Sequence, residues 1–166
     1  MFIERFTNYL QYEKRFSAHT VSAYIQDLHQ FQNFLLSLET DFSSVKHHHI
    51  RSWIVDLLDN QAEPRSIQRK LSSLRTFYKF LQREGLIDQN PTLLVRAPKV
   101  SKRLPVFIED SSINQLLDGT GVFSEDFEGL RDQIVIELLF GTGIRLAELL
   151  TLKDADINRY EQTILV

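Results

Sequence analysis

The stretch PRSIQRKLSSLRTFYKFLQREGL, residues 64–86, has the clearest structural pattern in the chain. Apolar side chains recur along it at steps of three and four residues, from Ile67 to Leu81. That spacing places them on one face of a helix, so the stretch predicts an amphipathic α-helix that packs on a core. Pro64 suits the first helical turn, and Gly85 suits the position just after the helix end.

Three apolar runs before this stretch also have helical spacing. Residues 2–10 predict a short opening helix, and residues 50–58 predict a third helix after a polar break. Between them, residues 21–35 form a long periodic run, and the Ser17 hydroxyl in front of that run is a candidate N-cap. These helices should bury their apolar faces against one another.

The chain divides by composition into a helical first domain, a short connection and a second domain. Residues 1–97 are predicted to form a compact all-α unit of four or five helices, the last of them short and opened by Asn90-Pro91. Residues 98–105, PKVSKRLP, hold two prolines around three positive charges and predict an extended basic linker. Residues 106–166 form the second domain.

The second domain has a less regular pattern. Residues 113–117 predict a short helix, residues 119–128 a loop rich in glycine and acidic side chains, and residues 130–140 a strongly apolar helix. Residues 144–152 predict another helical piece, and residues 163–166 predict a strand without a partner. Because a lone strand is not a stable ending, we expect the chain to be part of a longer protein.

The composition excludes several classes of protein. The 166 residues include no cysteine, which removes disulfides, thiol catalysis and cysteine-based zinc sites and is typical of a reducing cytoplasm. No window approaches the roughly 18 apolar residues of a membrane helix. The net charge of −3 is unevenly divided, since residues 1–104 hold 15 basic and 10 acidic residues whereas residues 105–166 hold 4 and 12. This asymmetry indicates two domains with different surfaces, in a protein that we expect to be cytoplasmic.

The face of residues 64–86 opposite the apolar stripe gathers positive charges and hydroxyl groups. Its members on a helical wheel are Arg65, Arg69, Ser72, Thr76, Lys79 and Arg83, with Ser66 beside them. Such a face can contact a phosphate backbone, and arginine can also bind the edge of guanine. The alternative is an ordinary solvated helix face, since charged outer faces are common.

The start of the second helix is another candidate contact. Lys14 and Arg15 precede it, and Ser17, His19 and Thr20 begin it. Free main-chain amides at a helix N-terminus can bind phosphate. The simpler alternative is that Ser17 only caps the helix, and the two roles are compatible.

Three consecutive histidines, residues 47–49, raise the question of a metal site. Adjacent side chains on a helix point in different directions, so the three cannot meet one ion, and no second ligand group lies at helical spacing. We therefore predict no metal site and expect a solvated helix start at these residues, with phosphate contact as an open alternative.

The segment LLFGTGIRLAELL, residues 138–150, is the most informative part of the second domain. Its apolar helix breaks at two glycines, and Arg145 follows directly. An arginine just beyond such a turn can be held rigidly toward a phosphate and offer it a bidentate fork. The alternative is that Arg145 pairs with Glu148 in the same helical turn.

Residues 141–157, GTGIRLAELLTLKDADI, resemble the first conserved box of the tyrosine site-specific recombinases, the phage integrase family. Residues 6–31 resemble the opening helices of that family's core-binding domain, and residues 66–87 resemble its fourth helix. Asn90-Pro91 and the linker up to Pro105 also match. The resemblance covers nearly the whole chain and is greatest to the Xer-type recombinases, which resolve chromosome dimers.

The resemblance implies a mainly α fold. A SAM-like core-binding domain would be followed by the truncated start of an α-rich catalytic domain, with its first strand at the C-terminus. It also implies strand exchange on duplex DNA, in which a tyrosine hydroxyl attacks the scissile phosphate to form a 3′-phosphotyrosine link. No metal, ATP or other cofactor is needed for this chemistry. Family members act as homo- or hetero-tetramers on two DNA sites and not on membranes.

The resemblance also assigns roles to residues. Arg145 takes the place of the first arginine that stabilises the developing charge on the phosphate, and Glu148 that of an acid supporting the arginine-bearing helix. The second and fourth helices would approach the major groove, and Lys99, Lys102 and Arg103 in the linker would follow the DNA backbone. No tyrosine in the chain matches the nucleophile, so the chain by itself is expected not to cleave DNA.

Two functions follow from these observations. The first is the N-terminal portion of a Xer-like recombinase that acts in chromosome-dimer resolution or mobile-element integration. The second is a non-catalytic helical module that binds DNA or another protein.

Overall fold

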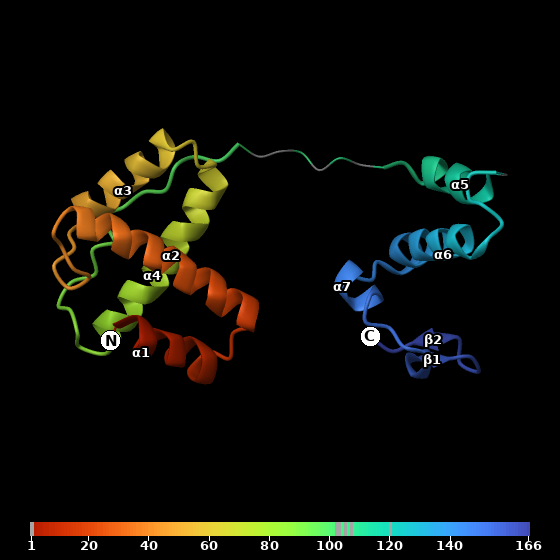
Figure 1. Cartoon of the computed structure of the whole chain (residues 1–166), viewed down its shortest axis with the longest axis horizontal. Helices are drawn as coiled ribbons and strands as arrows, with labels where there is room; N and C mark the ends of the chain where they lie inside the picture. Colours follow the sequence, from red (N-terminus) through yellow and green to blue (C-terminus); the bar gives the residue numbers. More distant parts are fainter. Residues whose placement is uncertain (1, 102–103, 105, 107, 120) are drawn as a thin grey trace. The chain divides into compact units, whose positions relative to one another are not determined.

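A computed structural model describes residues 2–101, 104, 106, 108–119 and 121–166. The chain forms two compact units, Met1–Lys102 and Arg103–Val166. Helices make up most of the first unit and about half of the second (Figure 1), which confirms the mainly α fold class. Among the residues that the structure describes, no helix is long and apolar enough to cross a bilayer.

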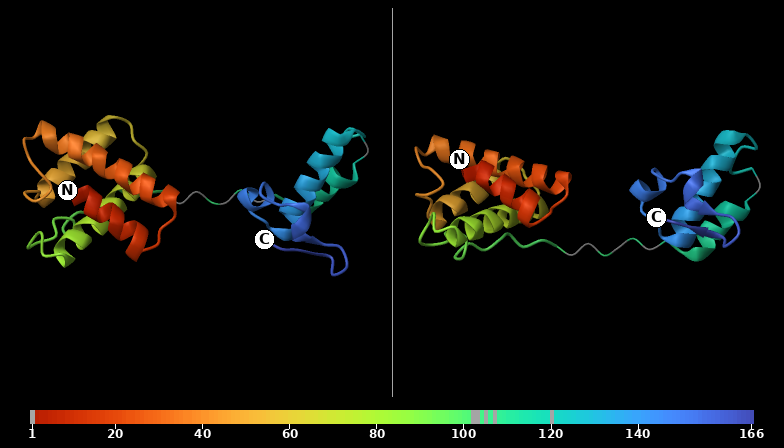
Figure 2. Two further views of the ribbon diagram at one scale, coloured as in Figure 1. Left: turned by 60° about the horizontal axis from the view of Figure 1, so that its bottom comes forward. Right: turned by 90° about the horizontal axis from the view of Figure 1, so that it is seen from below.

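The first unit is a bundle of crossing helices. Its α-helices are α1 (Phe2–Asn8), α2 (Ala18–Ser37), α3 (His47–Asp59) and α4 (Pro64–Arg83). A π-helical turn at Tyr9–Glu13 continues α1, so the opening helix ends in a wider turn than its apolar spacing predicts. The long helices α2 and α4 cross each other (Figures 1 and 2), and α1 and α3 each contact both of them.

The predicted start of α2 and the predicted end of α4 are both confirmed. Ser17 is the N-cap of α2, and its Oγ accepts a hydrogen bond from the main-chain N–H of Thr20 at 3.3 Å. Gly85 follows α4 in the left-handed conformation, with φ of 67°. Its N–H donates to the carbonyl of Gln82, and the N–H of Leu86 donates to that of Leu81. This pair of bonds is a Schellman motif, which satisfies carbonyls that the helix end would leave free.

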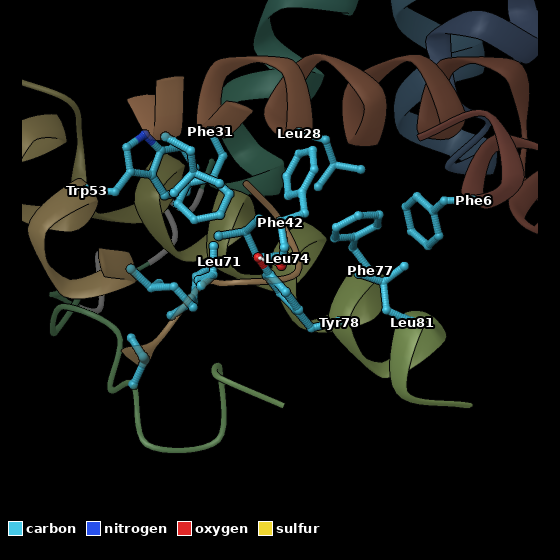
Figure 3. Packing of buried hydrophobic residues seen from close by; sticks show 14 of the residues in the cluster. Phe6, Leu28, Phe31, Phe42, Trp53, Leu71, Leu74, Phe77, Tyr78 and Leu81 are labelled. Carbon is cyan, nitrogen blue, oxygen red and sulfur yellow. Dashed lines mark hydrogen bonds between the residues drawn. The ribbon is translucent and has the colours of Figure 1, made fainter. Parts of the chain in front are cut away.

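Aromatic side chains fill the centre of the first unit (Figure 3). The Phe77 ring from α4 lies edge-on to Phe6 of α1 at 5.2 Å between centroids, and edge-on to Phe42 at 4.9 Å. Trp53 of α3 is buried, with its ring 4.8 Å from that of Phe31. Tyr78 donates its buried hydroxyl to the carbonyl of Phe42, and burial raises the pKa of this phenol well above its usual value.

The prediction of a short helix after Asn90-Pro91 is wrong. Residues 91–94 form a turn, in which Oδ1 of Asn90 accepts from the N–H and the hydroxyl of Thr92 at 2.9 and 2.7 Å. The Asn90 side chain thus forms a local turn by binding the Thr92 N–H, which a helix would otherwise use. The four residues are too few to add a series of helical hydrogen bonds.

The segment after this turn is held against the helices. The guanidinium of Arg75 on α4 donates to the carbonyl of Val95 at 3.0 Å, and the amide of Gln68 donates to that of Pro98 at 2.9 Å. Val95 is buried in the core. The chain therefore leaves the first unit along α4, on the side of the helix where Gln68 and Arg75 lie.

The second unit is smaller and more open. Its elements are α5 (Asp110–Asp118), α6 (Phe127–Thr142), α7 (Leu146–Leu149), a 3-10 turn (Asp154–Asp156), β1 (Ile157–Asn158) and β2 (Thr163–Ile164). Helix α6 begins three residues before the predicted start, because Asp126 caps it by accepting from the N–H of Gly129 at 2.9 Å. Helix α7 is shorter than the predicted residues 144–152.

The expectation of an unpaired terminal strand is also wrong. β2 pairs antiparallel with β1, with Ile157 opposite Ile164 and Asn158 opposite Thr163. Oδ1 of Asn158 accepts from the main-chain N–H groups of Tyr160 and Glu161 and so closes the hairpin. The first strand has only two residues, which is too short to produce a visible alternation in the sequence.

Candidate nucleic-acid interface and phosphate-binding arginine

The outer face of α4 carries two exposed cations without an intramolecular partner. Within the described part of the chain, neither Arg65 nor Lys79 has a hydrogen bond or ion pair with another side chain. The hydroxyls of Ser72 and Thr76 donate to main-chain carbonyls of their own helix at 3.0 Å each. Their oxygens still have lone pairs toward solvent, so this face offers both positive charge and hydrogen-bonding groups.

Arg69 lies on the same face but has a strong intramolecular partner. Its Nη1 and Nη2 atoms donate to the two carboxylate oxygens of Asp27 on α2, at 2.6 and 2.8 Å. The Asp27 side chain is 1% exposed, whereas that of Arg69 is 51% exposed. Lys70 and Ser73 donate to the same carboxylate at 3.2 and 2.7 Å. A buried charge therefore joins α2 and α4 where they cross.

Arg83, at the end of α4, lies among acidic and aromatic side chains. Its guanidinium pairs with Glu84 at 3.0 Å and with Glu13 at 3.2 Å. It also lies 4.5 Å from the centroid of the Tyr9 ring and 5.7 Å from that of Phe80. Arg83 therefore pairs with two carboxylates, more than any other candidate cation on α4.

The start of α2 gathers the second group of candidate residues. The hydroxyls of Ser17 and Thr20 lie 2.9 Å apart, and His19 is exposed between them. Nζ of Lys14 lies 5.8 Å from the centroid of the Tyr9 ring. Arg15 is exposed with φ of 51°, a left-handed conformation that ends the π-helical turn without a glycine.

Replacing Ser17 by alanine should lower the free energy of unfolding by about 1 kcal/mol, because the first turn of α2 loses its side-chain acceptor. Asp at this position caps equally well but repels phosphate. S17D should therefore keep the stability of the wild type and, if this helix start contacts DNA, lose affinity. Chemical denaturation and DNA titration of both variants would separate capping from contact, and unchanged binding by S17D would exclude the contact.

The three histidines occupy the first turn of α3. Nδ1 of His49 accepts from the main-chain N–H of Lys46 at 3.1 Å, so this ring helps to cap the helix. Burial and the nearby positive groups of His48 and Lys46 lower the pKa of His49. A neutral ring is the form that can accept this bond. Among the described residues, no group of three or more His, Cys, Asp and Glu side chains is arranged for a metal ion.

The basic connection is described only in part. Lys99 is exposed, directly after the Pro98 carbonyl that Gln68 binds. Lys102 and Arg103, the other two predicted contacts, lie outside the described residues.

The break after α6 places Arg145 at the start of α7. Gly143 ends α6 with φ of 67° and donates its N–H to the carbonyl of Leu139 at 3.2 Å. Glu148 accepts from the main-chain N–H of Arg145 at 2.9 Å and from its Nη1 at 2.7 Å. Pairing with Glu148 and contact with a phosphate are therefore compatible roles for Arg145. It has this intrahelical partner, and its side chain is still 83% exposed.

Glu148 is held in its ionised form. The main-chain N–H of Arg145, followed by its guanidinium, lowers the pKa of this carboxyl below the usual value. A lowered pKa means that the charged partner of Arg145 persists through the neutral range and is lost only as the pH falls through that lower value. The pair can thus fix the guanidinium while its other N–H groups stay free.

Asp27, which matches a position in the family's opening helices, and Lys70, at the edge of the apolar stripe, were not predicted as members of the candidate site. Asp27 lies three residues after Tyr24 and four before Phe31, at the apolar spacing of its helix. A carboxylate at such a position requires a buried partner. The apolar spacing could therefore have shown that Asp27 is buried and paired, but the sequence alone does not show that Arg69 is its partner.

Comparisons with known proteins place the chain in a class. The family model described as "Phage integrase, N-terminal SAM-like domain" matches residues 3–85. The fold is also similar to that of the integrase from mycobacterium phage Brujita, with a TM-score of 0.56 and 20% identity over 98% of this chain and 52% of that one. The chain therefore belongs to the phage integrase family, and its first unit is the SAM-like domain.

Within that family, the chain is similar to tyrosine recombinases called XerC. It is 37% identical to the XerC of Bacillus pumilus, over 99% of this chain and 53% of that protein. It is 40% identical to the XerC of Alcanivorax borkumensis, over 99% of this chain and 52% of that protein. The chain thus spans about half the length of the curated relatives it matches.

Proposed function

We propose that the chain is the DNA-binding domain and the first catalytic segment of a site-specific tyrosine recombinase. The observation that carries the proposal is the XerC similarity, which extends from the SAM-like unit through the segment around Arg145. The domains would be residues 1–97 for DNA binding, residues 98–105 as the linker and residues 106–166 as the start of the catalytic domain. The reaction would proceed through a 3′-phosphotyrosine on a tyrosine that this chain does not supply.

In this proposal the outer face of α4 and the start of α2 bind duplex DNA. On the face of α4, Arg65 and Lys79 are the cations without an intramolecular partner among the described residues, and Ser66, Ser72 and Thr76 provide polar groups next to them. Such contacts to phosphate orient a protein on the duplex, while contacts to base edges supply specificity. Lys99 would extend the contact along the backbone as the chain leaves the first unit.

The finer assignments concern the whole recombinase. The role of the whole protein would be chromosome-dimer resolution or mobile-element integration, and its active form would be a homo- or hetero-tetramer on two DNA sites. Arg145 would stabilise the charge that develops on the scissile phosphate, with Glu148 orienting it.

Lys79→Ala is expected to weaken binding to a mixed-sequence DNA duplex and to flatten its salt dependence by about one unit of log–log slope, because one fewer counterion is released. Lys46→Ala is the matched control, since it removes the same charge from the start of α3. Fluorescence anisotropy at several salt concentrations measures both slopes. Equal slopes for Lys79→Ala and the wild type would remove α4 from the interface, and the absence of any binding at low salt would favour a protein-interaction module.

A further inference from the structure

The buried carboxylate of Asp27 is the feature that the proposed DNA interface does not yet explain. Burial of an unpaired carboxylate is costly, and this one is satisfied by Arg69, Lys70 and Ser73, all from α4. Lys70 also donates to Oε1 of Gln30 at 2.6 Å, so α2 holds its ammonium from two sides. The cluster brings two cations to one anion and leaves a net positive charge at the helix crossing.

The guanidinium of Arg69 lies between the buried carboxylate of Asp27 and the solvent. The two terminal nitrogens donate to the two carboxylate oxygens in a bidentate pair, which fixes the orientation of the guanidinium. A guanidinium has five N–H groups, and this pair uses two of them. The remainder belong to a side chain that is 51% exposed, while the carboxylate behind it is 1% exposed. A phosphate approaching α4 would thus meet the guanidinium and not the anion.

We propose that Asp27 is a positioning residue for DNA binding, which holds Arg69 so that its remaining N–H groups point from the outer face of α4 to a phosphate. The inference rests on the proposed DNA-binding function. Without Asp27, the long side chain of Arg69 would sample many rotamers and would have to be ordered when DNA binds. With Asp27, that ordering is complete in the free protein.

A purely structural role for Asp27 makes a different prediction. If the carboxylate only joins α2 to α4 and neutralises Arg69, removing its charge would leave the surface more positive. DNA affinity would then rise, because more positive charge would face the phosphates. The sign of the change in affinity therefore distinguishes a positioning residue from a neutralising one.

The experiment measures duplex-DNA affinity and thermal unfolding of Asp27→Asn, with Asp59→Asn as its charge-matched control on the exposed side of α3. We expect Asp27→Asn to bind about three- to tenfold more weakly despite its added positive charge, whereas Asp59→Asn binds as tightly as the wild type or slightly more tightly. Stronger binding by both variants would overturn the inference.

A second pair of variants decides the question even where Asp27→Asn fails to fold. Arg69→Lys keeps the charge but cannot form the fork, so it should lose nearly as much affinity as Arg69→Ala while retaining the salt slope of the wild type. An Arg69→Lys variant that binds like the wild type would overturn the inference and leave the DNA interface intact. A wild-type chain that does not bind DNA at low salt would overturn both.

Discussion

Replacing Arg145 by alanine should lower the rate of DNA cleavage by the complete recombinase about 10²- to 10³-fold, while duplex affinity changes little. Removal of one preorganised donor to a developing anion has an effect of that size on related reactions. The arginine is suited to this role because its helix start is fixed by Glu148, yet its guanidinium is largely exposed. Single-turnover cleavage of a suicide substrate, together with DNA titration, separates chemistry from binding.

Two variants test whether position or charge is responsible. Arg145→Lys keeps a cation without a fork and should recover only a small part of the lost rate. Arg131→Ala removes an exposed arginine of α6 that pairs with Asp132 at 2.7 Å, and it should cleave at the rate of the wild type. Cleavage by Arg145→Ala at more than a tenth of the wild-type rate would exclude the catalytic assignment.

The helices of the first unit could be predicted because their local signals agree with one another. In α4, an apolar stripe, a proline in the first turn and a glycine after the last turn all indicate the same boundaries. The structure confirms them. Phe80, which lies off the stripe, packs on another element. Its ring stacks on that of Tyr9 at 4.8 Å.

The elements that could not be predicted are short or depend on distant contacts. Residues 91–94 and β1 each span only a few residues, so a single side-chain acceptor, Asn90 or Asn158, decides their conformation. The Asp27–Arg69 pair joins residues 42 positions apart. No periodic pattern encodes such a pairing, which depends on where the two helices cross.

The exposed positions of the cations on α4 were predictable from the sequence, but their ion pairs were not. Periodicity correctly assigns Arg65, Arg69, Lys79 and Arg83 to the helix surface, where all four are exposed. It does not distinguish the unpaired Lys79 from Arg83, which two carboxylates and a ring surround. Charge on a helix wheel therefore overstates how much of this face is free to bind phosphate.

Phe77→Ala is expected to lower the free energy of unfolding of the first unit by about 3–5 kcal/mol, the usual cost of removing a buried phenylalanine. The side chain is fully buried, and its ring lies against that of Phe6 on α1, that of Phe42 in the segment after α2, and that of its neighbour Tyr78 on α4. Since domains of this size are stable by roughly 5–15 kcal/mol, the variant should be close to unfolding at 37 °C.

Trp53 makes this loss measurable for the first unit alone. It is the only tryptophan in the chain, and its side chain is 1% exposed in the core, so its fluorescence during urea denaturation reports the unfolding of that unit. Phe77→Leu should cost less than half as much, because leucine refills most of the volume. Tyr12→Ala, at a residue 76% exposed, should change the midpoint little. A loss below 1 kcal/mol for Phe77→Ala would mean that the aromatic cluster does not hold α1, α4 and the Phe42 segment together.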